Sequence, residues 1–98
     1  MNEYELTFVL DPALKKNDKD EIQSKVEDWI KPLKGKITKF DDMGIRELAY
    51  EINKNKQALY MFCIITGRAN FDKIIQNRVK EDQRIWRYLL VKKINKTK

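Results

Sequence analysis

The chain has 98 residues, of which 42% are hydrophobic and 37% are charged. This length suits one domain with a single core, and the composition is that of a globular domain with a highly charged surface. It contains one cysteine and no histidine, which excludes an internal disulfide, Cys-rich zinc sites and histidine-assisted nucleophiles. We therefore expect a binding module without a cofactor or metal rather than an enzyme.

The N-terminal segment lacks the features of a targeting signal. Its first fourteen residues contain no Lys or Arg, whereas a secretory signal begins with a basic region. The longest apolar run, 58–65, is much shorter than the roughly 18 residues typical of a membrane span. Because a lone cysteine also favours a reducing compartment, we expect a cytoplasmic protein that does not bind membranes. A plastid location stays open.

Hydrophobic patterning predicts a strand and then a helix in the first third of the chain. Alternating apolar residues indicate a half-buried strand over 4–10, which Asp11-Pro12 ends. Asn17 or Asp18 is expected to cap a helix that ends near Gly35. The apolar positions of this helix, at helical spacing, are Ile22, Val26, Trp29, Ile30 and Leu33. We expect Trp29 to lie in the core.

The middle of the chain predicts a long hairpin. Residues 37–52 show an interrupted alternation, which indicates a long strand with a bulge or bend near 41–44. The polar segment 53–57 then leads to 59–65, whose continuous apolar run is typical of a strand covered on both sides.

The last third predicts a second helix and a final strand. Asn70 is expected to cap the helix, and residues 85–91 form the strand. The resulting order, strand-helix-strand-strand-helix-strand, is that of the split βαβ or ferredoxin-like fold, an α+β arrangement of a four-stranded antiparallel sheet with two helices on one face. We expect one such domain over residues 1–93 and a short basic tail over 94–98.

Positive charge is concentrated in the second half of the chain. Residues 1–50 carry a net charge of −2 and residues 51–98 a net charge of +8. Residues 84–98 contain no acid, and their basic side chains are Arg84, Arg87, Lys92, Lys93, Lys96 and Lys98. Such a patch suits the phosphates of a nucleic acid. A solvated edge strand with a solubilising tail would look the same, so both interpretations stay open.

The predicted fold leaves one face of the sheet without helices. If the strands alternate regularly, its outward residues are Tyr60, Phe62 and Ile64 on one strand with Leu89 and Val91 on another. An apolar patch edged by Arg87 is typical of a docking surface, unless the alternation is reversed or another segment covers it. Base stacking on Tyr60 or Phe62 is a weaker alternative, because this strand lacks the glycines and the basic residue of an RNA-recognition motif.

The segment Gly44-Ile45-Arg46-Glu47-Leu48-Ala49-Tyr50 combines a glycine that permits a bend with an arginine and a tyrosine. The planar guanidinium of Arg46 suits phosphate or ribose contacts. An ion pair with Asp41, Asp42 or Glu47 explains this arginine equally well.

An enzymatic alternative depends on the start of the second predicted helix. Gly67-Arg68-Ala69-Asn70 is the local arrangement that could hold an anion, because a helix N-terminus attracts negative charge. The alternative function is therefore a small ferredoxin-like enzyme acting on an acyl phosphate or similar anion. No catalytic group accompanies this loop, and Cys63, in the most apolar segment, is expected to be a buried structural thiol.

Three stretches carry a resemblance to a known family. They are Tyr4-Glu5 with the strand that runs to Asp11-Pro12, Gly44-Ile45-Arg46-Glu47-Leu48-Ala49-Tyr50-Glu51-Ile52, and Ile85-Trp86-Arg87-Tyr88-Leu89-Leu90-Val91-Lys92. In this order and spacing they resemble the bacterial small-ribosomal-subunit protein S6 family, over about residues 3–93. The middle stretch fits the family pattern of Gly, aliphatic, Arg, any, Leu-Ala-Tyr, any, Ile throughout.

The resemblance implies a ferredoxin-like fold and a structural, non-enzymatic role without a small-molecule substrate. Members of the family pair with ribosomal protein S18, and the pair binds the central domain of small-subunit ribosomal RNA during assembly. By position and charge, the expected RNA-binding residues are Arg46, Arg84, Arg87, Lys92 and Lys93. The expected protein-partner surface is Tyr50, Tyr60, Phe62, Ile64, Leu89 and Val91.

The chain also departs from the family pattern. Many members have Arg or Lys at the second and third positions, where this chain has Asn2 and Glu3. Many have Pro in place of Glu51, and some have a long tail that wraps the partner. We therefore expect no RNA contact from the N-terminus, and we expect the short basic tail to contact phosphates.

Overall fold

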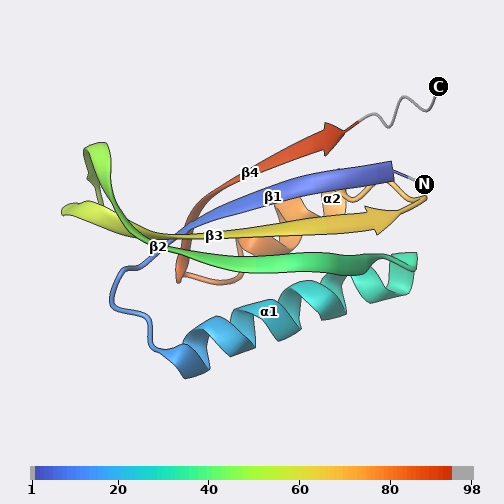
Figure 1. Ribbon diagram of the computed structural model, residues 1–98, viewed down its shortest axis with the longest axis horizontal. Coiled ribbons are helices and arrows are strands. Elements are labelled where there is room, and N and C mark those ends of the chain that lie inside the picture. Colours follow the sequence, from blue (N-terminus) through green and yellow to red (C-terminus); the bar gives the residue numbers. More distant parts are fainter. Residues whose placement is uncertain (1, 94–98) are drawn as a thin grey trace.

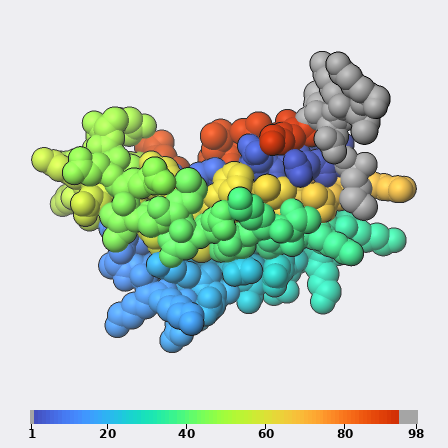
Figure 2. Space-filling model, in the orientation of Figure 1, coloured from blue at the N-terminus to red at the C-terminus, as the bar shows by residue number. Residues whose placement is uncertain are grey.

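The computed structural model describes residues 2–93, which form a four-stranded antiparallel sheet with both helices on one side (Figure 1). Figure 2 shows the surface of the first helix, in blue, along one side of the molecule below the green surface of the second strand. The elements are β1 (Asn2–Leu10), α1 (Lys16–Ile30), the short 3-10 helix η1 (Lys31–Leu33), β2 (Lys36–Ile52), β3 (Asn55–Gly67), α2 (Asp72–Val79) and β4 (Ile85–Lys93). The strand order is β2-β3-β1-β4, so the predicted ferredoxin-like fold is confirmed. The tail expected over 94–98 lies outside the described residues.

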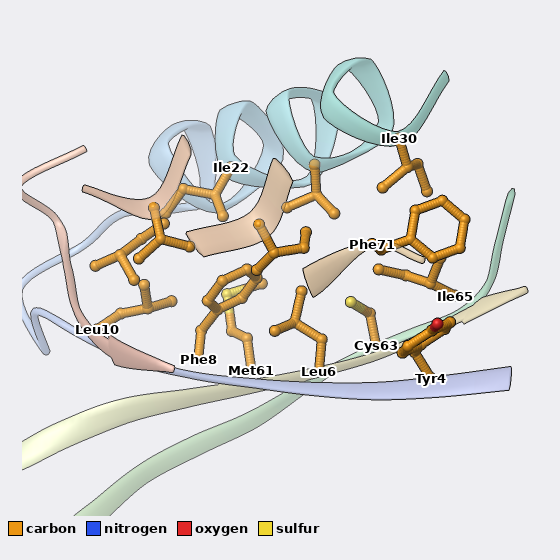
Figure 3. Close-up of a cluster of buried hydrophobic side chains, with 14 of the residues drawn as sticks. Tyr4, Leu6, Phe8, Leu10, Ile22, Ile30, Met61, Cys63, Ile65 and Phe71 are labelled. Atoms are coloured by element: carbon orange, nitrogen blue, oxygen red, sulfur yellow. The ribbon is translucent and has the colours of Figure 1, made fainter. Parts of the chain in front are cut away.

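The core lies between the sheet and the helices. The alternation of β1 places Tyr4, Leu6, Phe8 and Leu10 at no more than 1% exposure, and Figure 3 shows these side chains pointing from β1 toward α1. The core also takes Leu59, Met61, Cys63 and Ile65 from β3, together with Ile22, Val26 and Ile30 from α1. The predicted alternation of β3 is therefore confirmed. Neither helix of the described residues has the length and apolarity to cross a membrane.

The two helices begin in different ways. α1 begins at Lys16, so the prediction of a cap at Asn17 or Asp18 was wrong. Asp18 instead lies inside the first turn, where its carboxylate accepts a hydrogen bond from the backbone N–H of Lys15 at 3.1 Å. At α2 the N-cap residue is Phe71, which makes no side-chain capping hydrogen bond, so the prediction of a cap at Asn70 was wrong by one residue. The Asn70 side-chain oxygen still accepts a hydrogen bond from the Asp72 N–H at 2.9 Å, at the start of the helix.

Phe71 anchors the start of α2 in the core through close contacts with two glycines. A Cβ on Gly67 would lie 2.7 Å from the Phe71 Cζ, and a Cβ on Gly35 would lie 2.8 Å from its Cε1. The Phe71 ring also meets Tyr4 edge to face, with centroids 5.3 Å apart. Gly35 and Gly67 are therefore required by packing.

The pairing of β2 with β3 is irregular at three places, the last of them between Glu47 and Ile52 near the hairpin turn, and the first two explain the irregular sequence pattern. The register shifts between Ile37 and Lys39 and again between Asp42 and Gly44. The first shift allows Ile37 and Phe40, three residues apart, to pack against the same core. The second falls in the predicted segment 41–44, and Gly44 there has a φ of +83°, a conformation that favours glycine.

The hairpin of β2 and β3 extends past the end of β1, whose last partner is Leu59. Figure 1 shows this hairpin, in green and yellow-green, curving away from the other strands. Asn53 and Lys54 form its two-residue turn with φ values of 51° and 63°, the conformation of a type I′ turn. The predicted connection 53–57 was too long, because residues from Asn55 onward belong to β3.

Candidate nucleic-acid and protein interface

The side of the sheet opposite the helices presents a surface built from three strands. The pairing of β1 with β3 and β4 places Tyr60, Val9 and Arg87 in one row, Phe62, Thr7 and Leu89 in the next, and Ile64, Glu5 and Val91 in the third. We call these residues the open face. Leu89 is 62% and Val91 42% exposed, while the three β3 residues are half-buried. Five of the six residues expected to meet a protein partner therefore share one surface.

Charged pairs border the apolar part of the open face. Lys93 Nζ lies 3.1 Å from Glu5 Oε2, and on β2 Lys39 Nζ lies 3.4 Å from Asp41 Oδ2. The hydrogen bond to Glu5, together with the charges of Glu5 and Glu3, raises the pKa of Lys93. Exposed ion pairs of this kind contribute little to the stability of the fold. Lys93 and Lys39 can therefore exchange their carboxylate partners for an RNA phosphate at little cost in stability.

Tyr50, the sixth expected partner residue, approaches the open face from the hairpin. It is 65% exposed, and the Arg87 Cζ lies 6.0 Å from its ring centroid, within the range of a cation–π contact. The two residues belong to strands at opposite edges of the sheet. The curved hairpin therefore brings Tyr50 to one end of the open face, beside β4.

Arg46 lies on the hairpin, beside Ala58 of β3, and is exposed. Two of its three expected carboxylate partners bind other residues. Asp42 pairs with Lys19 of α1 at 2.6 Å, and Asp41 pairs with Lys39. The hydrogen bond from Lys19 lowers the pKa of Asp42. These pairs weaken the interpretation of Arg46 as an intramolecular ion-pair partner.

Arg84 lies among carboxylates on the side of the sheet that the helices cover. Its Nε and Nη2 donate to the two oxygens of Asp82 at 3.0 and 2.8 Å, and its Nη1 donates to Glu21 at 3.0 Å. Asp82 is 7% exposed, and the hydrogen bonds from Arg84 hold the pKa of this carboxyl well below its usual range despite burial. Arg84 thus links the loop before β4 to α1, and its guanidinium is directed at carboxylates of the protein itself.

The alternation of β4 separates the remaining basic residues. Lys93 pairs with Glu3 and lies on the same side as Arg87, about 20 Å along the strand. Lys92 pairs with Tyr4, whose side chain lies under the helices. The structure therefore brings Arg87 and Lys93 to one face and places Lys92 at the opposite face of the same edge strand.

The arrangement at the start of α2 does not support the enzymatic alternative. Gly67 is buried against Phe71, and the Asn70 side chain is occupied by the Asp72 N–H. Asp72 places a negative charge in the first turn, where a bound anion would otherwise benefit from the helix dipole. Cys63 is buried, and burial raises the pKa of its thiol to about 12, so the thiolate needed for nucleophilic attack is disfavoured.

One aromatic residue of the interface region did not stand out in the sequence pattern. Trp86 lines a pocket at the outer edge of β4 together with Arg87. Trp29, expected in the core, is half-buried and lines a second cleft between α1 and α2. Trp86 and Arg87 are adjacent in the predicted strand, and the sequence does not indicate which of them is the unpaired residue of a bulge. The sequence therefore contains no signal for the position of Trp86.

Comparison with known proteins assigns this open-faced sheet to a family. Residues 3–92 match the family model for ribosomal protein S6. The chain belongs to the ribosomal protein S6 family. The match covers almost the whole described sheet and includes the hairpin and β4, and it confirms the resemblance identified from the sequence motifs.

Individual members of the S6 family and a plant protein show the extent of the similarity. The chain is 34% identical over 91 residues to the small ribosomal subunit protein bS6 of Trichlorobacter lovleyi, covering 93% of this chain and 75% of that protein. The crystal structure of 30S ribosomal protein S6 from Thermotoga maritima superposes with a TM-score of 0.82 at 25% identity, covering 94% of this chain and 87% of that one. A chloroplastic Arabidopsis thaliana protein, regulator of fatty acid composition 3, is 30% identical over 93 residues, which are 95% of this chain but 29% of that protein.

Proposed function

We propose that this chain is a structural constituent of the small ribosomal subunit that binds the central domain of small-subunit ribosomal RNA together with ribosomal protein S18 during assembly. The match to the S6 family over residues 3–92 is the observation that carries the proposal. The bacterial relatives described above are named as proteins of the small ribosomal subunit or of the 30S particle. We place the chain on the ribosome of its cell or organelle.

The open face supplies a physical basis for a protein partner. Leu89 and Val91 are large apolar residues left exposed in the free protein, and Tyr50 adds an aromatic ring at one end. Burial of apolar surface is the main favourable contribution to association, and tyrosine and arginine are enriched in interfaces. We therefore assign Tyr50, Tyr60, Phe62, Ile64, Leu89 and Val91 to the S18 surface.

Basic residues of the hairpin and of β4 supply a basis for RNA binding. We assign RNA contact to Arg46 and Arg87, with Lys92 and Lys93 at the other end of β4. Arg84 is left out of this set, because its guanidinium is occupied by Asp82 and Glu21. Side chains of this kind bind phosphates and fix the position of a protein on RNA, whereas they read little base sequence.

A titration against a fragment of the central domain of small-subunit ribosomal RNA tests this function, with and without S18, at several salt concentrations. We expect tight binding in the presence of S18 and a steep loss of affinity with salt. Replacing Arg87 and Lys92 with Gln should reduce the slope of log K against log salt by about two at most. Arg84→Gln is the matched control and should leave the slope unchanged. Absence of any gain from S18 would contradict the proposal.

A further inference from the structure

A pocket of about 450 Å³ lies at the outer edge of β4, where the loop after α2 meets the start of the strand. Its lining includes Lys80, Gln83, Trp86, Arg87 and Tyr88. Trp86 is half-buried, while Lys80, Gln83 and Arg87 are exposed. Two aromatic residues, two cations and an amide therefore line one pocket.

A bulge in β4 positions Trp86 at this pocket. Arg87 pairs with Val9 and Ile85 pairs with Leu10, so Trp86 is an extra residue without a partner on β1. Bulges of this kind redirect a side chain and occur often beside binding sites. β4 is also an edge strand, so one row of its backbone N–H and C=O groups faces the pocket side without a partner strand.

We propose that this pocket binds one unpaired nucleotide of RNA, with its base stacked on Trp86 and its phosphate held by Lys80 and Arg87. The proposal rests on the RNA-binding function proposed above. The basic residues assigned there contact the phosphates of the RNA, and this pocket adds a site for one base. Bases of single-stranded RNA stack on aromatic side chains irrespective of their sequence. The Gln83 amide offers both a donor and an acceptor to the edge of the base.

The charge of the pocket favours an anionic ligand. Asp82 is the acidic residue in its lining, and its carboxylate is bound by Arg84 at 2.8 Å and by Lys25 at 3.2 Å. It therefore does not neutralise Lys80 or Arg87. Among the described residues, no hydrogen bond or ion pair occupies the side chain of Lys80 or Gln83, or the indole N–H of Trp86.

The cleft at Trp29 is a natural comparison, because it also has an aromatic wall. Its volume is about 610 Å³, and Lys73, Arg78 and Asp28 lie in its lining. Here Arg78 pairs with Glu81 at 3.3 Å, and Asp28 adds a negative charge. No residue of the open face lines this cleft. We therefore assign the nucleotide to the Trp86 pocket and use Trp29 as the control.

Tryptophan fluorescence tests the assignment, because the chain has two tryptophans. Trp29→Phe leaves Trp86 as the only tryptophan, and Trp86→Phe leaves only Trp29; excitation at a wavelength that tyrosine does not absorb isolates the tryptophan emission. Each variant is titrated in the presence of S18 with the central-domain RNA fragment and, separately, with a single-stranded oligouridine, after subtraction of the emission of S18. We expect RNA to quench Trp86 and to leave Trp29 unchanged.

Affinity measurements make the test independent of the optical signal. Trp86→Leu should weaken binding of the central-domain RNA about tenfold, the effect typical of losing one stacked base. Trp86→Phe keeps an aromatic ring and should retain most of the affinity, which separates lost stacking from a damaged fold. Lys80→Gln should weaken binding severalfold, whereas Lys73→Gln, in the other cleft, should not.

The possible outcomes separate a failure of the pocket assignment from a failure of the proposed function. If RNA binds with S18 but Trp86 is not quenched and Trp86→Leu binds normally, the pocket assignment is overturned and the ribosomal function stands. Quenching by S18 alone would make the pocket a protein-binding site and would also overturn the assignment. If the unmodified protein does not bind the RNA at all, both proposals fail.

Discussion

Arg84 binds Asp82 through two parallel hydrogen bonds, from Nε to Oδ1 at 3.0 Å and from Nη2 to Oδ2 at 2.8 Å. The same guanidinium reaches Glu21 on α1 at 3.0 Å. A residue of the basic C-terminal segment therefore joins the start of β4 to the first helix. Bidentate pairs of this type are among the stronger polar contacts in proteins.

Arg84→Gln should lower the free energy of unfolding by about 2 kcal/mol, because a nearly buried carboxylate would lose its two charged hydrogen bonds. The Asp82 side chain is 6% exposed, and Lys25 compensates only in part. Arg87→Gln is the matched control and should change stability by less than about 0.5 kcal/mol, since Arg87 is exposed. Urea unfolding at pH 7 measures both values. Equal effects of the two substitutions would show that the Asp82 pair is not a stabilising contact.

The contrast between Arg84 and Arg87 shows what local sequence patterns do not encode. The repeating patterns of residues 4–10, 59–65 and 85–91 were sufficient to predict the sheet, because alternation is a local property. Arg84 binds Asp82, two residues before it, and Glu21, which is 63 residues away in sequence. An aspartate two residues before an arginine does not by itself indicate an ion pair, and local patterns do not encode the contact with Glu21, so the sequence pattern does not distinguish Arg84 from Arg87.

The same limit applies to residues placed by bulges and curvature. The contact between Arg87 and Tyr50 depends on how far the hairpin bends, and the position of Trp86 depends on a register shift against β1. The bulge in β2 was predictable because Gly44 and the broken alternation marked it. No glycine or turn residue marks the bulge at Trp86.

The stability of the protein should decrease in acid, and Asp82 should account for part of the change. Hydrogen bonds from Arg84 hold the folded-state pKa of this carboxyl well below its ordinary value of 3.8. A lowered carboxyl pKa stabilises the fold above the ordinary value, and this contribution is lost as the pH falls toward the folded-state value. We expect the free energy of unfolding to be nearly constant from pH 7 to about 5 and to fall below about pH 4.5.

Urea unfolding at a series of pH values tests the role of Asp82. Asp82→Asn should lower stability at pH 7 and flatten the decrease in acid. Asp42→Asn should have a smaller effect, because the Asp42 side chain is 39% exposed and solvent screens its pair with Lys19. An acid decrease that is unchanged in Asp82→Asn would assign it to other carboxylates.

The hairpin turn contains a lysine in a conformation that suits glycine. Lys54 has a φ of 63° and follows Asn53 at 51°, and asparagine followed by glycine is the preferred pair for a type I′ turn. Lys54→Gly should therefore raise the free energy of unfolding by about 0.5–1 kcal/mol. Lys56→Gly, within β3, is the control and should be destabilising. Both are measured by chemical unfolding, and a loss of stability in Lys54→Gly would exclude the type I′ turn.

Leu89 offers the most direct test of the partner surface, because it is 62% exposed in the middle row of the open face. Leu89→Ser should change the free energy of unfolding by less than about 0.5 kcal/mol, since the side chain is already in water. It should weaken S18 binding about tenfold, because a large apolar contact would be lost in the complex. Calorimetric titration with S18 gives the affinity, and thermal unfolding confirms that the fold is intact.

Ile45→Ser provides the control for this test. Ile45 is 53% exposed and equally apolar, but it pairs with Leu59, whose side chain faces the helices, so it does not belong to the open face. We expect this variant to bind S18 normally. If Ile45→Ser weakens binding and Leu89→Ser does not, the partner docks on the opposite side of the sheet. Tyr60 and Phe62 of β3 must then have another role.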